Sequence, residues 1–201
     1  GDPSHFDVVS GYRLPPAIAS RVTYMDYICS HDGVDKVGMQ GADPPDQQPV
    51  VAVTIGGGDG GGATVVEPFL EMMRRFADRI DFRAEIVLGP LVDHDTQLRC
   101  QELARGRPVQ LHQFVESTGS LLRRAEVVIS TAGYNTVTDI LSLARRWVVI
   151  PRVLYREEQR IRAQMLQARG LCGYLDPEDV TPERLFDAIA ETSVPSDVDA
   201  V

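Results

Sequence analysis

Six glycines and one aspartate occupy the seven consecutive positions 56–62. They follow a β-branched run at residues 50–55 and precede an apolar-periodic stretch that predicts a helix over about residues 63–79. At such a strand-to-helix turn, exposed backbone N–H groups and the positive end of the helix favour an anion, commonly a phosphate. The loop is therefore a candidate phosphate site, with a merely flexible turn as the alternative.

Two better-known phosphate loops fit this stretch poorly. Gly56, Gly58 and Gly61 satisfy the dinucleotide pattern G-x-G-x-x-G, but the next expected strand, at 82–88, is followed by Gly-Pro and not by a ribose-binding acid. No Gly-Lys-Ser/Thr follows either, which excludes a P-loop. Asp59 would repel a phosphate, so we expect it to point away, cap the helix or face a second substrate.

A second group of polar residues lies after the expected strand at 126–130. Ser, Thr and Gly at 130–133 precede a helix whose first turns carry Asn135, Thr136 and Asp139. Hydroxyls and N–H groups at a helix start can bind an anion, and a carboxylate one turn further can accept both hydroxyls of a ribose. The alternative is ordinary capping plus a surface acid.

A third group opens the helix expected at 157–169. Glu158 and Gln159 would face the carboxyl edge of the sheet, where they could bind sugar hydroxyls. The residues alone favour a solvated helix with ion pairs at helical spacing. The charged residues that could pair in this way are Glu157, Glu158, Arg160, Arg162 and Arg169.

Short β-branched runs alternate with helical stretches along the chain, which predicts an α/β fold: a parallel sheet with helices on both faces. Ligands bind such sheets at the carboxyl ends of the strands. The expected strands are 50–55, 82–88, 108–114, 126–130, 146–151 and 171–175, and the expected helices are 63–79, 93–105, 118–124, 134–144, 157–169 and 181–191.

Composition limits the function. A net charge of −9 over 201 residues argues against sequence-independent nucleic-acid binding. The three cysteines are far apart, which favours a reducing, cytoplasmic compartment, and the four histidines lack metal-ligand spacing. No run of apolar residues is long enough to span a membrane. We expect no bound metal and no cofactor.

The chain divides by composition into four parts. Residues 34–49 are rich in Gly, Pro and Asp and predict a linker, residues 50–191 form the αβ unit, and residues 192–201 form a tail. Residues 1–33 begin with Gly and include a strand-like alternation at 21–28. We expect this chain to be part of a longer protein.

Taken together and in this order, the three polar groups resemble the C-terminal half of GT-B glycosyltransferases. The likeness is closest to the family of the bacterial N-acetylglucosaminyltransferase that makes lipid II, together with the plant galactolipid synthases. It covers roughly residues 49–191 and implies a Rossmann-like half of a GT-B fold that binds a nucleotide-sugar. Residues 1–33 resemble the end of the N-terminal acceptor domain in such enzymes.

The resemblance implies a role for each matching residue. Asp139 matches the ribose-binding acid, which is Glu in the family, and Glu158 departs from a Gln-Gln pair that holds sugar hydroxyls. Because of this departure, the resemblance does not identify the sugar. The remaining implied contacts are Gly56, Gly57, Gly58, Thr131, Ala132, Gly133 and Thr136 for the diphosphate, Phe114 and Val115 for the base, and Gln159 for the sugar.

The implied activity is metal-independent transfer of a sugar from a nucleotide-sugar to an acceptor hydroxyl, and the resemblance favours inversion of configuration. UDP-sugars are favoured over GDP- or dTDP-sugars, and the acceptor is unknown. The catalytic residues and any membrane contact would belong to the N-terminal domain or a partner subunit, so this half would be inactive alone. The alternatives are a binding subunit of a split GT-B enzyme, a UDP-sugar 2-epimerase-like domain and an NAD(P)-binding domain.

Overall fold

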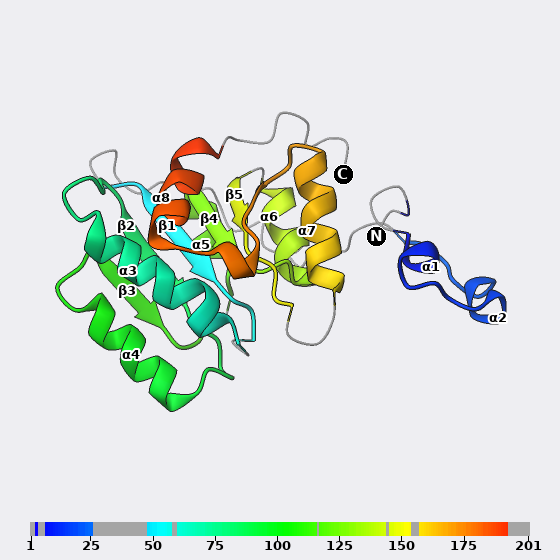
Figure 1. The fold of residues 1–201 in the computed structure, drawn as a ribbon, viewed down its shortest axis with the longest axis horizontal. Helices are drawn as coiled ribbons and strands as arrows, with labels where there is room; N and C mark the ends of the chain where they lie inside the picture. Colours follow the sequence, from blue (N-terminus) through cyan, green and yellow to red (C-terminus); the bar gives the residue numbers. More distant parts are fainter. Residues whose placement is uncertain are drawn as a thin grey trace.

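A six-stranded parallel sheet forms the centre of the protein, in the order β3-β2-β1-β4-β5-β6 (Figure 1). The computed structural model describes residues 3, 7–25, 48–57, 60–115, 117–143, 145–153 and 157–192. The strands are β1 (Val50–Thr54), β2 (Arg83–Val87), β3 (Val109–His112), β4 (Val127–Ser130), β5 (Arg146–Val149) and β6 (Gly173–Tyr174). The predicted parallel α/β sheet is confirmed.

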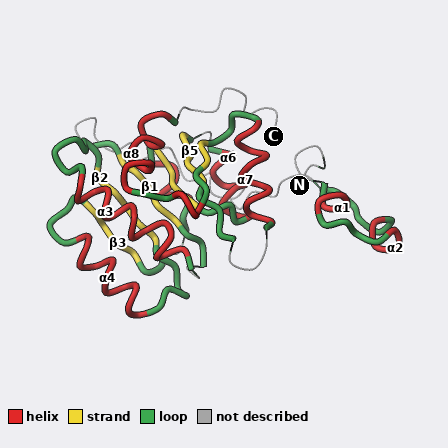
Figure 2. Tube along the Cα trace, viewed as in Figure 1, coloured by secondary structure: helices red, strands yellow, loops and turns green. Residues whose placement is uncertain are grey.

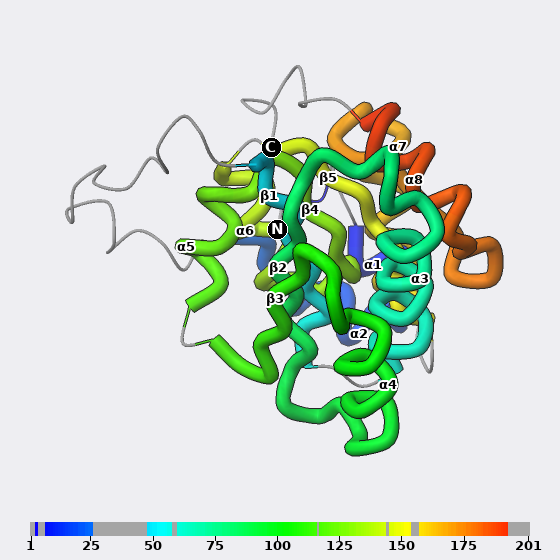
Figure 3. The backbone as a smooth tube through the Cα atoms, turned by 90° about the vertical axis from the view of Figure 1, so that its left-hand side faces the viewer, coloured from blue at the N-terminus to red at the C-terminus, as the bar shows by residue number. Residues whose placement is uncertain are grey.

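Helices cover both faces of this sheet (Figure 2). The first face carries a π-helical turn, η1 (Gly62–Val66), with α3 (Glu67–Arg75), α4 (His94–Ala104) and α8 (Pro182–Glu191). The second carries α5 (Gly119–Arg124), α6 (Tyr134–Ser142) and α7 (Glu158–Ala168). A 3-10 turn, η2 (Pro177–Asp179), leads into α8. Figure 3 shows α5 and α6 on one side of the strands and α3 on the other.

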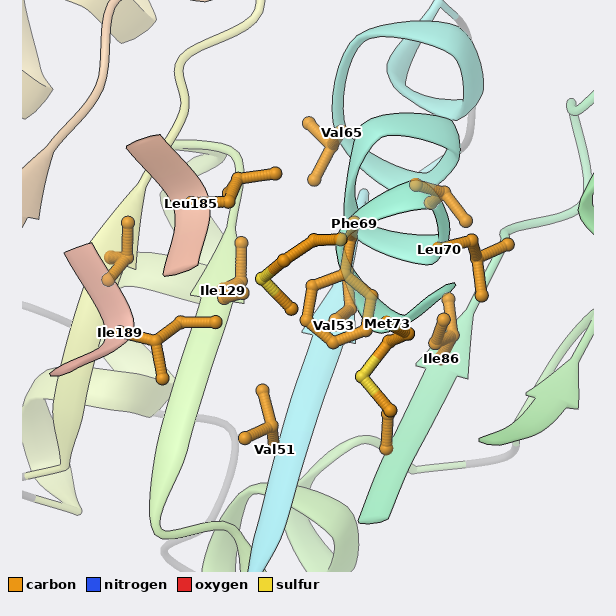
Figure 4. Close-up of a cluster of buried hydrophobic side chains, with 14 of the residues drawn as sticks. Val51, Val53, Val65, Phe69, Leu70, Met73, Ile86, Ile129, Leu185 and Ile189 are labelled. Atoms are coloured by element: carbon orange, nitrogen blue, oxygen red, sulfur yellow. The ribbon is translucent and has the colours of Figure 1, made fainter. Parts of the chain in front are cut away.

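The core follows the alternation of side chains along the strands. In β1, Val51 and Val53 pack into the cluster of the first face, while Ala52 belongs to the second. Figure 4 shows the first cluster, in which Phe69 of α3 lies above β1 and is fully buried. Each such large apolar side chain contributes about 1.5–3 kcal/mol by leaving water.

The loops after β1 and β4 diverge from neighbouring points of the sheet. Thr54 and Ser130, the last residues of the two strands, are paired in register. The chain after β1 turns to the first face and the chain after β4 turns to the second. The strand order reverses here, and such a switch point opens a crevice at the carboxyl ends of the strands, where open α/β sheets bind ligands.

The N-terminal segment holds two short helices, α1 (Val8–Gly11) and α2 (Pro16–Ala19). Asp7 caps α1 and accepts a hydrogen bond from the Tyr24 hydroxyl, which lowers the pKa of Asp7 to about 2. The strand-like alternation at 21–28 does not form a strand over Arg21–Met25, which is turn and irregular backbone. Its first N–H groups bond back to the carbonyls of Ile18 and Ala19 and so are not available to a neighbouring strand.

Most of the predicted linker (34–49) and nearly all of the tail (192–201) lie outside the described residues, so the domain boundaries stay predictions. No helix among the described residues is long and apolar enough to span a membrane.

Candidate functional site

The loop after β1 requires glycine for two reasons: a positive φ angle at some positions and a lack of space for a Cβ at others. Gly56 has φ +66° and Gly60 has φ +71°, conformations that favour glycine. A Cβ on Gly61 would lie 2.7 Å from Ile55 Cβ, and one on Gly62 would lie 2.6 Å from Thr96 Cγ2. Gly61 and Gly62 are therefore required by packing within the protein.

Gly57 is different, because the folded protein leaves room for a side chain there. A Cβ would meet only Leu91 Cδ1, at an ordinary 3.5 Å. The residue is exposed, and its carbonyl accepts the Leu91 N–H at 2.9 Å. Gly56 and Gly57 are thus exposed glycines that offer open backbone at this edge. The predicted contacts of Gly58 and the orientation of Asp59 lie outside the described residues.

The start of α6 follows β4 at this switch point. Thr131 and Ala132 are buried, and Gly133 is the N-cap without a side-chain hydrogen bond to the helix. The Gly133 carbonyl accepts the first helical hydrogen bond, from Val137 N–H at 2.9 Å. Thr136 lies half-buried on the first turn. Gly133 supplies no side-chain cap to α6, but glycine is itself a common N-cap residue, so ordinary capping stays an alternative.

Asp139 is only 6% exposed. It is therefore not a surface acid, which removes that part of the alternative. The neighbouring Asn135 is exposed and Thr136 is half-buried, so the helix face that they share with Asp139 runs from solvent toward the interior. The role of Asp139 as the acceptor of hydrogen bonds from the ribose hydroxyls stays a prediction.

A buried hydrogen bond fixes the loop between β4 and α6, and this bond was not predicted from the sequence. The Trp147 indole N–H donates to Ser130 Oγ at 2.8 Å, and that hydroxyl donates to the Thr131 carbonyl at 3.0 Å. Both side chains are fully buried. A buried tryptophan in an apolar strand signals that its N–H needs an acceptor, but the acceptor comes from the neighbouring strand.

The predicted base-binding pair follows β3. Phe114 is 67% exposed, whereas Val115 packs partly against the second core cluster. A large exposed aromatic ring at the carboxyl edge of a sheet is a suitable neighbour for a flat base. This loop is separated from β1 by the intervening strand β2.

On α7, the two predicted sugar contacts already have partners within the chain. The Glu158 carboxylate pairs with Arg162, and Gln159 Oε1 accepts the backbone N–H of Arg152 at 3.0 Å. The expected ion pairs of this helix are therefore confirmed for Glu158. However, the Arg162 side chain is only 12% exposed, because it points toward the loop after β4 and not into solvent. From the sequence, Arg162 is expected only to be a charge on a solvated helix.

A buried carboxylate on β2 lies outside the predicted site. Burial raises the pKa of Glu85, but hydrogen bonds and charges from Arg83 and Arg124 outweigh this effect and lower its pKa overall. The distances from Glu85 are 2.6 Å to Arg83 and 3.0 Å to Arg124, and His112 Nε2 lies 3.8 Å away. This network ties β2 to α5. Within the described ranges, no three His, Cys, Asp or Glu side chains form a metal-ligand group.

Comparison with known proteins identifies the family. Residues 52–198 match the family described as glycosyltransferase family 28 C-terminal domain. The UDP-N-acetylglucosamine--N-acetylmuramyl-(pentapeptide) pyrophosphoryl-undecaprenol N-acetylglucosamine transferase of Haemophilus influenzae (strain PittGG) is 24% identical over 140 residues, covering 70% of this chain and 39% of the relative. The chain thus spans about two fifths of the length of this relative.

Solved structures share the fold. MurG of Acinetobacter baumannii superposes with a TM-score of 0.58 at 20% identity, covering 75% of this chain and 41% of that one. The glycosyltransferase VinC, in complex with dTDP, gives 0.55 at 19% identity, covering 73% and 33%. The sheet described above is therefore a Rossmann-like half of a GT-B fold. Since the family match covers well over half of the chain, from the middle of β1 to beyond α8, the chain belongs to the glycosyltransferase family 28 C-terminal domain family.

Proposed function

We propose that this chain binds the nucleotide-sugar donor of a sugar transfer in the crevice between the loops after β1 and β4. The observation that carries this proposal is the N-terminus of α6, where Gly133 provides no side-chain cap, next to the exposed glycines after β1. Helix N-terminal N–H groups and bare backbone suit a diphosphate. Family membership favours this function over an epimerase or an NAD(P)-binding domain.

The proposed contacts divide by chemical group. The diphosphate would lie between the loop at 56–58 and the residues 131–133 with Thr136, and Asp139 would accept the ribose hydroxyls. Backbone groups of Phe114 and Val115 would bind the base. For the sugar, Glu158 and Gln159 are proposed, and the Gln159 amide NH₂ is the group best suited to donate, since its oxygen accepts the Arg152 N–H.

The reaction of the full protein would be attack of an acceptor hydroxyl on the anomeric carbon of the donor, with loss of the nucleoside diphosphate. The bond from the anomeric carbon to the diphosphate oxygen breaks as the new glycosidic bond forms. Charge that develops on the leaving oxygen would be stabilised by the N–H groups at the start of α6, which are in place before the reaction. We propose an inverting, metal-independent transfer, with the base that removes the acceptor proton in another domain or subunit, which would also make any membrane contact.

UDP is the proposed nucleotide, because the name of the Haemophilus influenzae relative gives a UDP-sugar as its donor. A dTDP-sugar is the second candidate, because VinC was solved with dTDP. The two bases differ little in shape, so the choice depends on contacts with the base and the ribose.

A nucleotide panel tests the proposal. Thermal unfolding with UDP, dTDP, GDP and NADH should show a selective shift with UDP. Ligand at about a hundred times its Kd stabilises by about 2.7 kcal/mol, or about 5–10 °C in a chain of this size. Titration calorimetry should then show UDP binding weakened about tenfold or more by Asp139→Asn. The matched control is Asp187→Asn, on the exposed side of α8, which should leave binding unchanged. A shift with NADH alone, or with no nucleotide, would contradict the proposal.

A further inference from the structure

One arginine of α7 reaches the loop that starts α6. Arg162 Nη1 donates to the Ala132 carbonyl at 2.6 Å, although the two residues are 30 positions apart. Its Nη2 pairs with the Glu158 carboxylate, one turn earlier on α7. The guanidinium also lies 5.9 Å from the centre of the Tyr134 ring. The Arg162 side chain thus joins a predicted sugar contact to the predicted diphosphate wall.

We infer that Arg162 is a positioning residue of the donor site: by bridging the Glu158 carboxylate and the Ala132 carbonyl, it offsets the charge of Glu158 and orients the N–H of Gly133 toward the donor's diphosphate. This inference rests on the proposed function and adds to it a residue for which the sequence suggested no such role.

The first argument concerns one peptide group. The Ala132 carbonyl and the Gly133 N–H belong to the same planar trans peptide, so they point in opposite directions. With the carbonyl held by Arg162, the Gly133 N–H is directed away from the guanidinium. Within the part of the chain that the structure describes, this N–H makes no backbone hydrogen bond. A charged donor on the carbonyl polarises the peptide and makes its N–H a stronger donor to an anion.

The second argument concerns charge. A carboxylate beside a bound diphosphate repels it, and Glu158 opens the helix that packs near this site. A cation at bonding distance cancels most of that repulsion. The planar guanidinium is suited to this task because its N–H groups can bind a carboxylate and a carbonyl at the same time, which a lysine ammonium cannot do with the same geometry.

The neighbouring arginine on α7 behaves differently. Arg160 pairs with Glu157 at 3.5 Å and with Asp176 at 3.4 Å, on the side of α7 that faces the segment after β6. Glu157 is 60% exposed. The Glu157–Arg160 pair therefore provides a control of the same chemistry on the same helix, away from the loop after β4.

The test is a double-mutant cycle on the whole chain, with UDP as the titrant in calorimetry. Arg162→Gln should weaken UDP binding about tenfold, because Glu158 is then left unneutralised. Glu158→Gln should bind UDP at least as well as the wild type. The double variant should recover part of the loss, so that the two changes are non-additive by about threefold or more. The control, Glu157→Gln, should leave UDP affinity unchanged.

A second measurement needs no ligand. The amide resonance of Gly133 should shift in Arg162→Gln and in Arg162→Lys, because neither side chain reproduces the guanidinium on the Ala132 carbonyl. Arg162→Lys should recover UDP affinity relative to Arg162→Gln, since it keeps the charge, and it serves in place of Arg162→Gln if that variant does not fold.

The outcomes separate the two proposals. If the wild type binds UDP and the Arg162 variants bind it equally well, or if the cycle is additive, the positioning role is refuted and the donor site stands. A wild type that binds no nucleotide refutes the donor site and this inference with it.

Discussion

Gly57 and Gly61 offer a test of which glycines serve the fold and which serve a ligand. Both lie in the loop after β1, and both can be changed to alanine, which adds a single methyl group. The structure predicts opposite results. Gly61→Ala should destabilise the protein, whereas Gly57→Ala should leave stability nearly unchanged and weaken nucleotide binding.

The magnitudes follow from the contacts. A Cβ at residue 61 would lie 2.7 Å from Ile55 Cβ, an atom fixed to the backbone directly after β1, so the backbone itself must shift. Overpacking of this kind costs about 1–3 kcal/mol, and each kcal/mol lowers Tm by about 2–4 °C in a chain of this size. A Cβ at residue 57 would meet only the end of the Leu91 side chain, at 3.5 Å. Its effect on stability should stay within about 0.5 kcal/mol.

The two variants should affect UDP affinity in the opposite order to stability. If the diphosphate approaches the backbone at Gly57, a methyl group there removes or lengthens a charge-assisted hydrogen bond of about 1.5–3 kcal/mol. UDP affinity should then fall about tenfold or more. Gly61→Ala, measured well below its Tm, should retain most of the wild-type affinity, because its methyl group faces Ile55 and not the crevice.

Differential scanning fluorimetry and titration calorimetry with UDP measure both quantities on the same samples. Unchanged UDP affinity in Gly57→Ala would show that the diphosphate does not approach this loop. Unchanged stability in Gly61→Ala would show that the contact with Ile55 is not as tight as described.

Three further predictions concern buried groups. Ser130→Ala removes the acceptor of the Trp147 N–H and should cost about 1–3 kcal/mol in urea unfolding followed by tryptophan fluorescence; no loss would contradict this hydrogen bond. The pKa of Glu85 is lowered in the folded state, so this residue contributes stability above its unfolded pKa that is lost as the pH falls through its folded pKa. Glu85→Gln should therefore reduce the acid dependence of unfolding, and an unchanged pH profile would refute this. Burial raises the pKa of Cys100 to about 11 and of Cys172 to about 12, so peptide mapping should find both unlabelled by iodoacetamide at pH 7.5 until the chain unfolds.

The sheet could be predicted because its strands are short, continuous β-branched runs separated by clear turn residues. The helix over 63–79 was predicted as one element, but it begins with the π-helical turn η1 and α3 ends at Arg75. There Phe76 leaves the helix and stacks on Phe186 of α8, with ring centres 4.7 Å apart. Local periodicity carries no information on such a distant contact. The strand-like alternation at 21–28 does not form a strand over Arg21–Met25, because alternation alone does not supply a neighbouring strand.

The candidate site was predictable in position and only partly in detail. Loop and helix starts are local features, so Gly56 and Gly133 could be found from the sequence. The burial of Asp139 depends on how α6 packs, and the separate tasks of Gly57 and Gly61 depend on Leu91 and Ile55. These contacts exist only in the folded chain.

A net charge of −9 is compatible with the proposed anionic ligand, because the effect of each charge depends on its distance from the ligand. At about 0.1 M salt, exposed charges more than about 10 Å apart are largely screened, so the total charge matters little at the crevice. What matters are the groups within a few ångströms: the N–H groups at the start of α6, where Gly133 provides no side-chain cap, and the Glu158–Arg162 pair, in which the arginine offsets the partly exposed carboxylate. An acidic protein can therefore bind a diphosphate through backbone dipoles and a single well-placed guanidinium, although the same acidity disfavours a long polyanion such as nucleic acid.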